Sequence, residues 1–201
     1  MFGTYEKKKE QIKKASMNSF ARYGYHKTTL DDIADQLGIK KNSLYYYFPS
    51  KEAIFNEIVV EEADLFIESL IDEIEKAKTI DKKINIIIHN MIYYAKEKSN
   101  LLTMPLKVII EIGEIIENSH KVFTVSTKKI IKNVLTDGVN SGELKKHNTA
   151  ELADNIFSFI DALQYKEFHS NQITSVNEID FPNIEKKVVS IVNLVLKGLK
   201  V

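Results

Sequence analysis

Hydrophobic side chains recur every three or four residues along most of this chain, which is the spacing of one face of an α-helix. The first such pattern predicts a helix over residues 5–23, with Ile12, Phe20 and Tyr23 on its apolar face. Gly24 follows directly and is the residue type that ends a helix in a left-handed conformation. Because the alternation of polar and apolar residues typical of strands is absent, we predict an all-α protein.

Two short helices are predicted next, separated by a glycine. Residues 28–32 combine two threonines with two aspartates, which are residue types that cap a helix start and favour its positive end. Gly38 ends this second helix, and residues 40–47 are expected to form the third. Leu44 and Phe48 lie four positions apart, so both are expected to face the first two helices.

The rest of the chain is predicted to form longer helices. A fourth helix over residues 50–77 is long enough to link two domains. Further helical patterns occupy residues 81–98, 101–111, 114–140, 148–168 and 183–200. We place a domain boundary at the start of the fourth helix, with a small domain at residues 1–49 and a larger one at residues 50–201.

Composition is consistent with long helices around a substantial core. Hydrophobic residues make up 44% of the 201 residues, and only 7 Gly and 3 Pro interrupt the chain. The chain has no Cys, which excludes disulfides, thiolate zinc sites and a cysteine nucleophile. The basic start lacks a following apolar stretch, and no apolar run could span a membrane. We therefore expect a soluble, cytoplasmic protein.

Charge is distributed unevenly although the formal net charge is zero. Residues 1–51 hold ten basic and five acidic residues, a balance of +5. The remainder holds 18 basic and 23 acidic residues, a balance of −5. A basic N-terminal domain suits contact with nucleic-acid phosphates.

The second and third helices fit a helix-turn-helix, the motif that reads the major groove of DNA. Residues 38–53, GIKKNSLYYYFPSKEA, closely resemble the signature of the tetracycline-repressor-like (TetR) family, as do residues 20–25, 28–29 and 33–34. The resemblance covers residues 12–55. It implies about nine helices, a homodimer, and a ligand cavity in the C-terminal domain.

Matched positions can be given physical roles in DNA binding. Lys41 and Lys51 supply ammonium groups for phosphates, and Thr28 and Thr29 offer hydroxyls and backbone N–H groups at a helix start. Side chains early in the third helix are the candidates for reading base edges; they are Lys40, Asn42, Ser43 and Tyr45. Tyr46 and Tyr47 either add hydroxyl contacts to phosphates or pack against Thr29 and the fourth helix, and a plain surface aromatic cluster is the alternative.

The third helix, which we expect to read the DNA sequence, departs from the family pattern in its first residues. The family most often has Ser-Lys-Gly-Thr where this chain has residues 40–43, KKNS. Lys40 cannot cap the helix as Ser does, and Asn42 places a side chain where the backbone usually approaches DNA. The operator sequence therefore cannot be taken from a relative. A second hypothesis is that the protein is a helical ligand sensor or adaptor that acts through a protein partner without sequence-specific DNA binding.

Aromatic, sulfur and imidazole side chains gather in the middle of the chain. Such residues can line an apolar pocket, although packed core residues look the same in sequence. The candidate ligand contacts are His89, Tyr93, Tyr94, Met104, Phe123 and Phe157. We expect a small, lipophilic effector whose binding releases a palindromic operator, which makes the protein a repressor.

Two apolar stripes near the C-terminus are candidates for a dimer interface. They comprise Leu152, Ile156, Phe159 and Leu163 in one helix and Val188, Ile191 and Val195 in the next. In the resembled family the last two long helices join the subunits, and burial within one subunit is the alternative for some of these residues. A dimer suits a DNA-binding domain that has one short recognition helix, because two half-sites lengthen the DNA sequence that is recognised.

Enzymatic motifs are not found. Glu117 and His120 have the Glu-x-x-His spacing of di-iron bundles, but that chemistry needs the motif twice together with two more glutamates. Gly-rich phosphate loops, zinc helices and nucleophile elbows do not occur in the sequence. We expect no catalytic residue, no bound metal and no cofactor.

Overall fold

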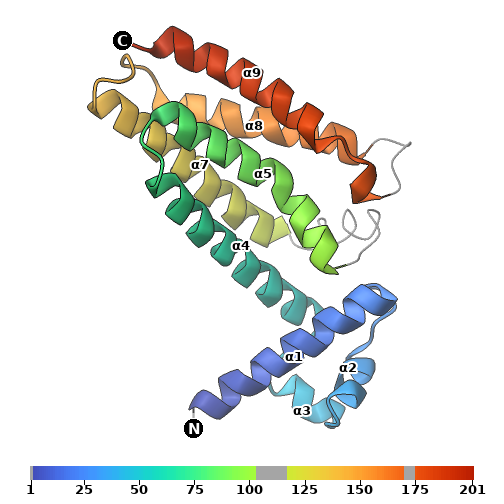
Figure 1. Cartoon of the computed structure of the whole chain (residues 1–201). Coiled ribbons are helices and arrows are strands. Elements are labelled where there is room, and N and C mark those ends of the chain that lie inside the picture. Colours follow the sequence, from blue (N-terminus) through green and yellow to red (C-terminus); the bar gives the residue numbers. More distant parts are fainter. Residues whose placement is uncertain (1, 103–116, 170–174) are drawn as a thin grey trace. The chain divides into compact units, whose positions relative to one another are not determined.

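The computed structural model describes residues 2–102, 117–169 and 175–201. Within these ranges the structure is helical (Figure 1). The same ranges hold one isolated β-bridge between Leu144 and Lys200. The elements are α1 (Phe2–Tyr23), α2 (Leu30–Gln36), α3 (Lys41–Tyr45), α4 (Lys51–Glu75), α5 (Ile80–Leu102), α7 (Glu117–Asn140), α8 (Thr149–Phe168), the short 3-10 turn η1 (Val176–Glu178) and α9 (Phe181–Leu199). The predicted all-α fold is confirmed. Most of the helix predicted for residues 101–111 lies outside the described residues.

The chain divides into two compact units. The first comprises Met1–Ala63 with Lys98–Ser119, and the second comprises Asp64–Glu97 with His120–Val201. Helix α4 contributes its first half to one unit and its second half to the other. None of the helices in the described ranges is long and apolar enough to cross a membrane.

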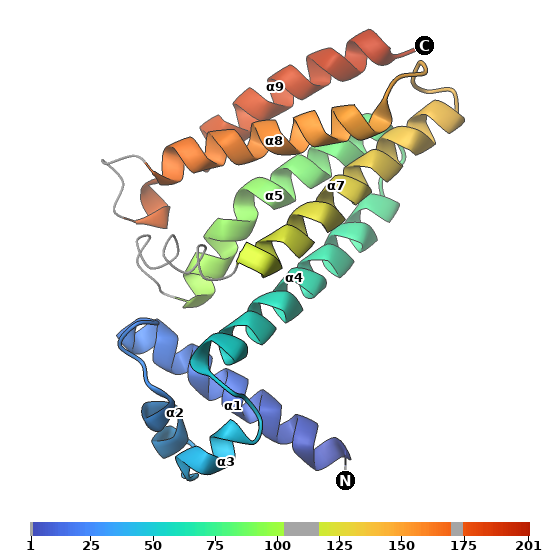
Figure 2. The same ribbon diagram turned by 180° about the vertical axis from the view of Figure 1, so that it is seen from behind.

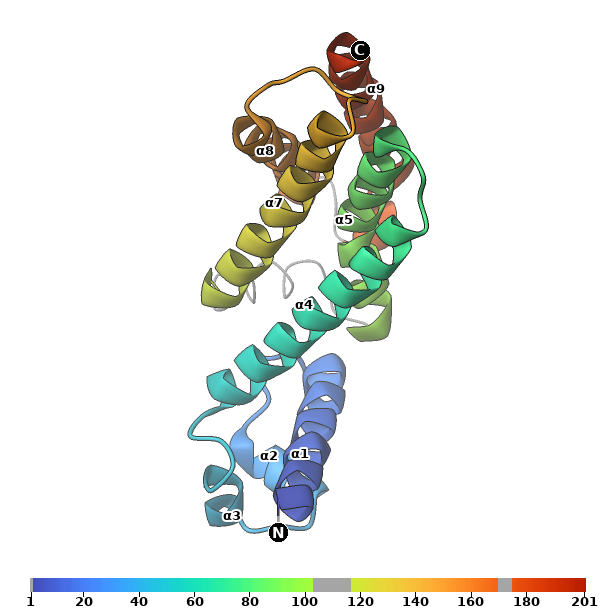
Figure 3. The ribbon, with the colours of Figure 1, turned by 90° about the vertical axis from the view of Figure 1, so that its left-hand side faces the viewer.

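The first unit is built from α1, α2, α3 and the first half of α4, with α2 and α3 beside α1 (Figure 3). Its core is aromatic and aliphatic, and comprises Ile12, Ala15, Phe20, Tyr25, Ile33, Ala34, Leu44, Phe48, Ile54, Phe55 and Ile58. Leu44 and Phe48 are 0% and 2% exposed, so the predicted inward pair is confirmed. These two side chains anchor α3 to the rest of the unit.

Local signals in the sequence determine where α1 and α2 begin and end. Gly24 and Gly38 have φ angles of 85° and 63°, a left-handed conformation that glycine adopts without steric cost. Thr29 caps α2 in a capping box, in which its hydroxyl accepts from the Asp32 backbone N–H and its own N–H donates to the Asp32 carboxylate. The predicted stops and the threonine cap are confirmed.

The second unit packs α5, α7, α8 and α9 with the second half of α4 (Figure 2). Its fully buried side chains are mainly aliphatic, including Leu70, Ile84, Ile87, Ile88, Ile92, Ile131, Leu135, Ile160, Val188 and Leu196. Polar contacts join neighbouring helices at the edge of this core. The Asn90 amide donates to Glu73 at 2.8 Å, and the Gln164 amide donates to the carbonyls of Met91 and Ile92.

The start of α9 differs from the sequence prediction. The structure begins this helix at Phe181, not at residue 183, because Asp180 accepts a hydrogen bond from the Asn183 N–H and caps it. Pro182 then occupies the first turn, where its missing N–H has no helical partner to lose. Burial of Phe181 extends the apolar face of α9 by one turn.

We expect Gly138→Ala to destabilise the second unit. A Cβ at this buried position in α7 would lie 2.8 Å from Leu144 Cδ1 and 2.9 Å from Ile80 Cγ1. Overpacking costs about 1–3 kcal/mol, whereas the higher helix propensity of Ala returns only about 1 kcal/mol. Urea unfolding followed by circular dichroism measures the net loss. Gly198→Ala is the matched control, because a Cβ at this position would meet no neighbouring atom within 4 Å. Its stability should equal that of the wild type or rise slightly. A Gly138→Ala protein as stable as the wild type would contradict this packing.

Candidate nucleic-acid interface

Helix α3 has one buried face and one exposed face. Leu44 lies inside the first unit with 0% of its surface exposed. The exposed side chains from this helix and its two ends are Lys40, Lys41, Asn42, Ser43, Tyr45 and Tyr46. Lys40 occupies the N-cap position and makes no side-chain cap hydrogen bond, as predicted from its chemistry. The helix therefore presents cationic, amide, hydroxyl and phenol groups outward, the chemistry that contacts DNA bases and phosphates.

Lys41 is exposed but forms an ion pair. Its ammonium lies 2.5 Å from Asp31 Oδ2, on the first turn of α2. The hydrogen bond to Asp31 raises the pKa of Lys41, so the side chain is charged throughout the neutral range. A phosphate that binds Lys41 has to compete with this carboxylate. Exposed ion pairs of this kind contribute little stability, so a phosphate can displace the carboxylate at a small cost in free energy.

The tyrosines around the end of α3 form an aromatic cluster, the alternative stated for them from the sequence, but its third member, Tyr5, was not anticipated. Tyr46 and Tyr47 were expected to meet phosphates or to pack on Thr29 and α4. The structure places both against Tyr5 in the first turn of α1, with ring centroids 5.8 Å and 4.9 Å away. Tyr46 keeps 73% of its surface exposed and remains accessible to DNA. Tyr47 is partly buried.

The two threonines at the start of α2 have different surroundings. Thr29 is exposed, and its hydroxyl is engaged in the capping box. Thr28 is 1% exposed, and its hydroxyl donates to the carbonyls of Gly24 at 2.9 Å and Ser19 at 3.1 Å. The Thr28 side chain, expected at the DNA surface, instead holds the turn between α1 and α2 together.

Lys51 also departs from its expected place. Its ammonium donates to the backbone carbonyls of Tyr25 at 2.7 Å and Thr28 at 2.9 Å. Desolvation by burial lowers the pKa of Lys51. An ammonium satisfied by two internal carbonyls has less capacity left for a phosphate than an exposed one.

Ion pairs join α1 to α4 inside the first unit. Lys9 lies 2.7 Å from Glu57, and Lys13 contacts Glu10, Glu57 and Glu61. Burial works to lower the pKa of Lys13, but hydrogen bonds with Glu10 and Glu61 outweigh it, so the pKa is raised. Sequence reasoning missed this network, because the charges that pair are 48 residues apart. It places part of the N-terminal positive charge inside the protein.

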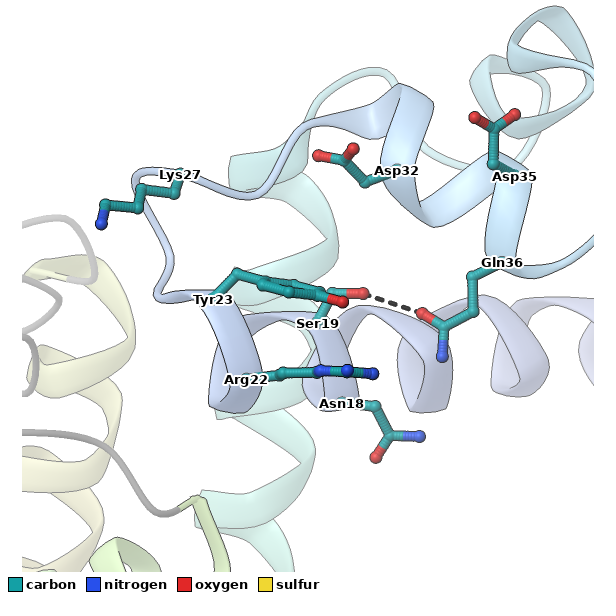
Figure 4. A pocket seen from close by; sticks show the side chains of 8 residues that line it. All are labelled: Asn18, Ser19, Arg22, Tyr23, Lys27, Asp32, Asp35 and Gln36. Atoms are coloured by element: carbon teal, nitrogen blue, oxygen red, sulfur yellow. Dashed lines mark hydrogen bonds between the residues drawn. The ribbon is translucent and has the colours of Figure 1, made fainter.

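A polar pocket of about 680 Å³ lies between the end of α1 and α2 (Figure 4). Its lining comprises Asn18, Ser19, Arg22, Tyr23, Lys27, Asp32, Asp35 and Gln36. Ser19 donates to Gln36 at 2.8 Å and so ties the two helices together (Figure 4). The lining holds two cations and two carboxylates, so its charge does not favour an anion.

The candidate ligand contacts of the second unit fall into separate groups. Tyr94 and Phe123 stack at 5.5 Å, and Phe66 on α4 joins them at 4.6 Å and 5.4 Å. His89 stacks on Tyr93 at 4.5 Å. Phe157 is buried within the core, and Met104 lies outside the described residues. The six predicted contacts are thus not all brought together.

His89 lies in an open groove of about 550 Å³ in the second unit. The groove is lined by Glu73, Lys76, Ala77, Lys82, Asn85, Ile86, His89 and Glu185. His89 Nδ1 lies 2.9 Å from Glu185 Oε1. Desolvation by burial, followed by the charge of Glu185, raises the pKa of Tyr93 beside it.

The proposed dimer stripes are partly buried inside the chain. Ile156 and Val188 belong to the core, and Leu152, Phe159 and Leu163 are half-buried. Ile191 and Val195 are 49% and 41% exposed. Leu194, which the sequence stripe omitted, lies beside them on α9 with 68% exposure. The helical spacing in the sequence did indicate Leu194, because this residue falls three positions after Ile191 on the same helical face.

Comparison with known proteins covers both units. The family model of bacterial regulatory proteins of the tetR family matches residues 12–58, which span the second half of α1, all of α2 and α3, and the start of α4. A relative, the fatty acid metabolism regulator protein of Bacillus subtilis, is 28% identical over 162 residues, which is 75% of this chain and 78% of that protein. This chain belongs to the TetR family.

Solved structures share the fold of this TetR-family regulator over nearly its whole length. A transcriptional regulator from Cytophaga hutchinsonii superposes with a TM-score of 0.74 at 21% identity, covering 96% of this chain and 98% of that one. The regulator FadR of Bacillus subtilis, solved in complex with stearoyl-CoA, superposes with a TM-score of 0.65 at 24% identity, covering 90% and 96%. The TetR-family chain is thus a DNA-binding transcriptional regulator with an N-terminal helix-turn-helix and a helical C-terminal bundle.

Proposed function

We propose that this TetR-family regulator is a homodimeric repressor that binds a palindromic operator through α3 and releases it when a lipophilic small molecule binds the second unit. The observation that carries the proposal is the outward presentation of α3, with Leu44 buried beneath a row of exposed polar side chains. In functional terms residues 1–49 read DNA, and residues 50–201 bind the effector and the second subunit. A regulator that binds operator DNA as the bacterial members of this family do acts in the cytoplasm.

The exposed groups of α3 fall into two functional classes. Asn42 suits the paired donor and acceptor of adenine, and Lys40 suits the two acceptors of guanine. Ser43 and Tyr45 add hydroxyl groups that reach the same groove. Lys41, with Tyr46 and the exposed Thr29 at the flank, contacts phosphates and positions the protein without reading sequence.

Dimerisation is supported by the apolar face of α9. Ile191, Leu194 and Val195 expose large aliphatic side chains at adjacent positions of one helix. Covering such a face removes apolar surface from water, and a second copy of α9 offers the same chemistry. Two subunits also place two α3 helices on half-sites about 34 Å apart along the duplex.

The effector class is proposed from the relatives and from the aromatic side chains of the second unit. The FadR structure holds stearoyl-CoA, and the Bacillus subtilis relative is named as a regulator of fatty acid metabolism. In this chain Phe66, Tyr94 and Phe123 form a half-buried aromatic cluster that an acyl chain can contact. We therefore assign the effector to long-chain acyl-CoA thioesters.

Base-reading and phosphate-binding side chains of α3 should respond differently to substitution. We expect Asn42→Ala to cost about 1–3 kcal/mol on the cognate operator and to relax preference at one base pair. Lys41→Ala should weaken binding to DNA of every sequence and reduce the slope of log affinity against log salt by about 0.9 per subunit. Fluorescence anisotropy on DNA upstream of the protein's own gene, over a salt series, measures both.

The matched control is Lys129→Ala, which removes an exposed lysine from α7 in the second unit. Its affinity and salt dependence should equal those of the wild type. A wild-type protein that binds no upstream fragment, or binds with no dependence on salt, would contradict operator binding and favour an adaptor role.

A charge placed on the α9 face should separate the subunits. Leu194→Asp puts an ionised carboxylate where a partner helix would cover it, and an unpaired buried charge is strongly unfavourable. Light scattering after size exclusion should change from dimer to monomer at micromolar concentration. Val125→Asp is the control, because Val125 has a similar exposure of 66% but lies on α7. Two variants that both remain dimeric would place the interface elsewhere.

Long-chain acyl-CoA should dissociate the operator complex. We expect stearoyl-CoA at micromolar concentration to reduce anisotropy of labelled operator DNA to the value of free DNA. Acetyl-CoA shares the headgroup and lacks the long chain, so it should have no effect, since each buried methylene contributes about 0.8 kcal/mol. Retention of DNA across the whole acyl series would refute this effector class and leave operator binding intact.

A further inference from the structure

The ammonium of Lys51 is held by two backbone carbonyls and an aromatic ring of the first unit. It donates to the carbonyl oxygens of Tyr25 and Thr28 at 2.7 Å and 2.9 Å, and it lies 4.3 Å from the centroid of the Tyr25 ring. Two charge-assisted hydrogen bonds and a cation–π contact engage the group. Such a side chain is held in one place, unlike an exposed lysine that follows a phosphate.

Aromatic side chains pack around the Tyr25 ring that Lys51 contacts. Tyr25 is 2% exposed, and its ring packs against Phe20 of α1 at 5.2 Å and Phe55 of α4 at 5.1 Å. Burial raises the pKa of the Tyr25 hydroxyl, and the nearby charge of Glu52 adds to this. Burial also lowers the pKa of Lys51. Both directions follow from the partial burial of the two side chains.

The two acceptor carbonyls belong to the turn that positions α2. Residues 24–29 connect α1 to α2, and Thr29 at their end is the N-cap of α2. Thr28 is itself buried and bonded back to α1. Helix α2 in turn packs beside α3, and Lys51 is the first residue of α4. A displacement of the first turn of α4 therefore acts on the start of α2 through one side chain.

We propose that Lys51 is a positioning residue that couples the first turn of α4 to the reading helix through the Tyr25 and Thr28 carbonyls, and that it is not a phosphate contact. Its charge serves to bind two internal dipoles. Loss of these hydrogen bonds lets the α1–α2 turn shift, and α2 and α3 shift with it. Of the two measurements that test this inference, only the one made with DNA depends on the proposed operator binding.

The test uses the full-length protein with Lys51→Met, which keeps the apolar stem and removes the donors. In ¹⁵N-labelled free protein we expect the backbone amide resonances of residues 41–45 to move. A merely structural role would lower the unfolding midpoint and leave these native resonances in place. Lys27→Met is the matched control, because Lys27 is an exposed lysine of the same turn and its removal should leave residues 41–45 unchanged. If Lys51→Met does not fold, Lys51→Gln should give a smaller shift in the same direction.

The second measurement is operator affinity over a salt series at a temperature where circular dichroism shows full folding. Lys51→Met should weaken binding by at least about tenfold, the scale of one lost base contact, with an unchanged salt slope. Lys41→Met should lower the slope by about 0.9 per subunit. A slope reduction by Lys51→Met equal to that of Lys41→Met, or unmoved α3 resonances, would overturn the proposal. Moved resonances in a protein that binds no operator would instead reject the proposed function.

Discussion

The burial of Leu44 and Phe48 is the constraint on which the DNA-binding unit depends. A helix of five residues has too few internal hydrogen bonds to be stable alone, so α3 exists because these side chains fill the core between α1, α2 and α4. Once that face is buried, the 3.6-residue period directs Lys40, Asn42, Ser43 and Tyr45 to solvent. The same packing event that stabilises the helix therefore exposes its reading face.

Charge in this unit divides into a structural and a functional part. Lys9 and Lys13 pair with glutamates of α4, and Lys51 binds backbone carbonyls. Lys40 and Lys41 remain at the surface. The basic balance of residues 1–51 consequently overstates the positive charge available to DNA. Removing such a lysine leaves its carboxylate or carbonyl partner uncompensated, whereas the intact pair adds little net stability over well-packed apolar residues, so these pairs matter more for geometry than for net stability.

The second unit meets a different requirement. Its core is mainly aliphatic, with Phe157 and Phe181 buried in it, and a cluster of three further aromatic residues is half-buried. A regulator has to keep one stable bundle while leaving surface for a ligand and a second subunit. The apolar stripe of α9 and the Phe66, Tyr94 and Phe123 cluster supply such surface without interrupting the helices.

Local chemistry was sufficient to predict the helices, their caps and the inward pair of α3. Period-3.6 patterns, Gly24, Gly38 and the Thr29 cap act over a few residues, so they can be read from the sequence. The tertiary structure alone decided that Thr28 and Lys51 point inward and that Tyr47 meets Tyr5. Each of these side chains is polar enough for the surface, and its place depends on partners distant in sequence. Only packing in three dimensions brings those partners together.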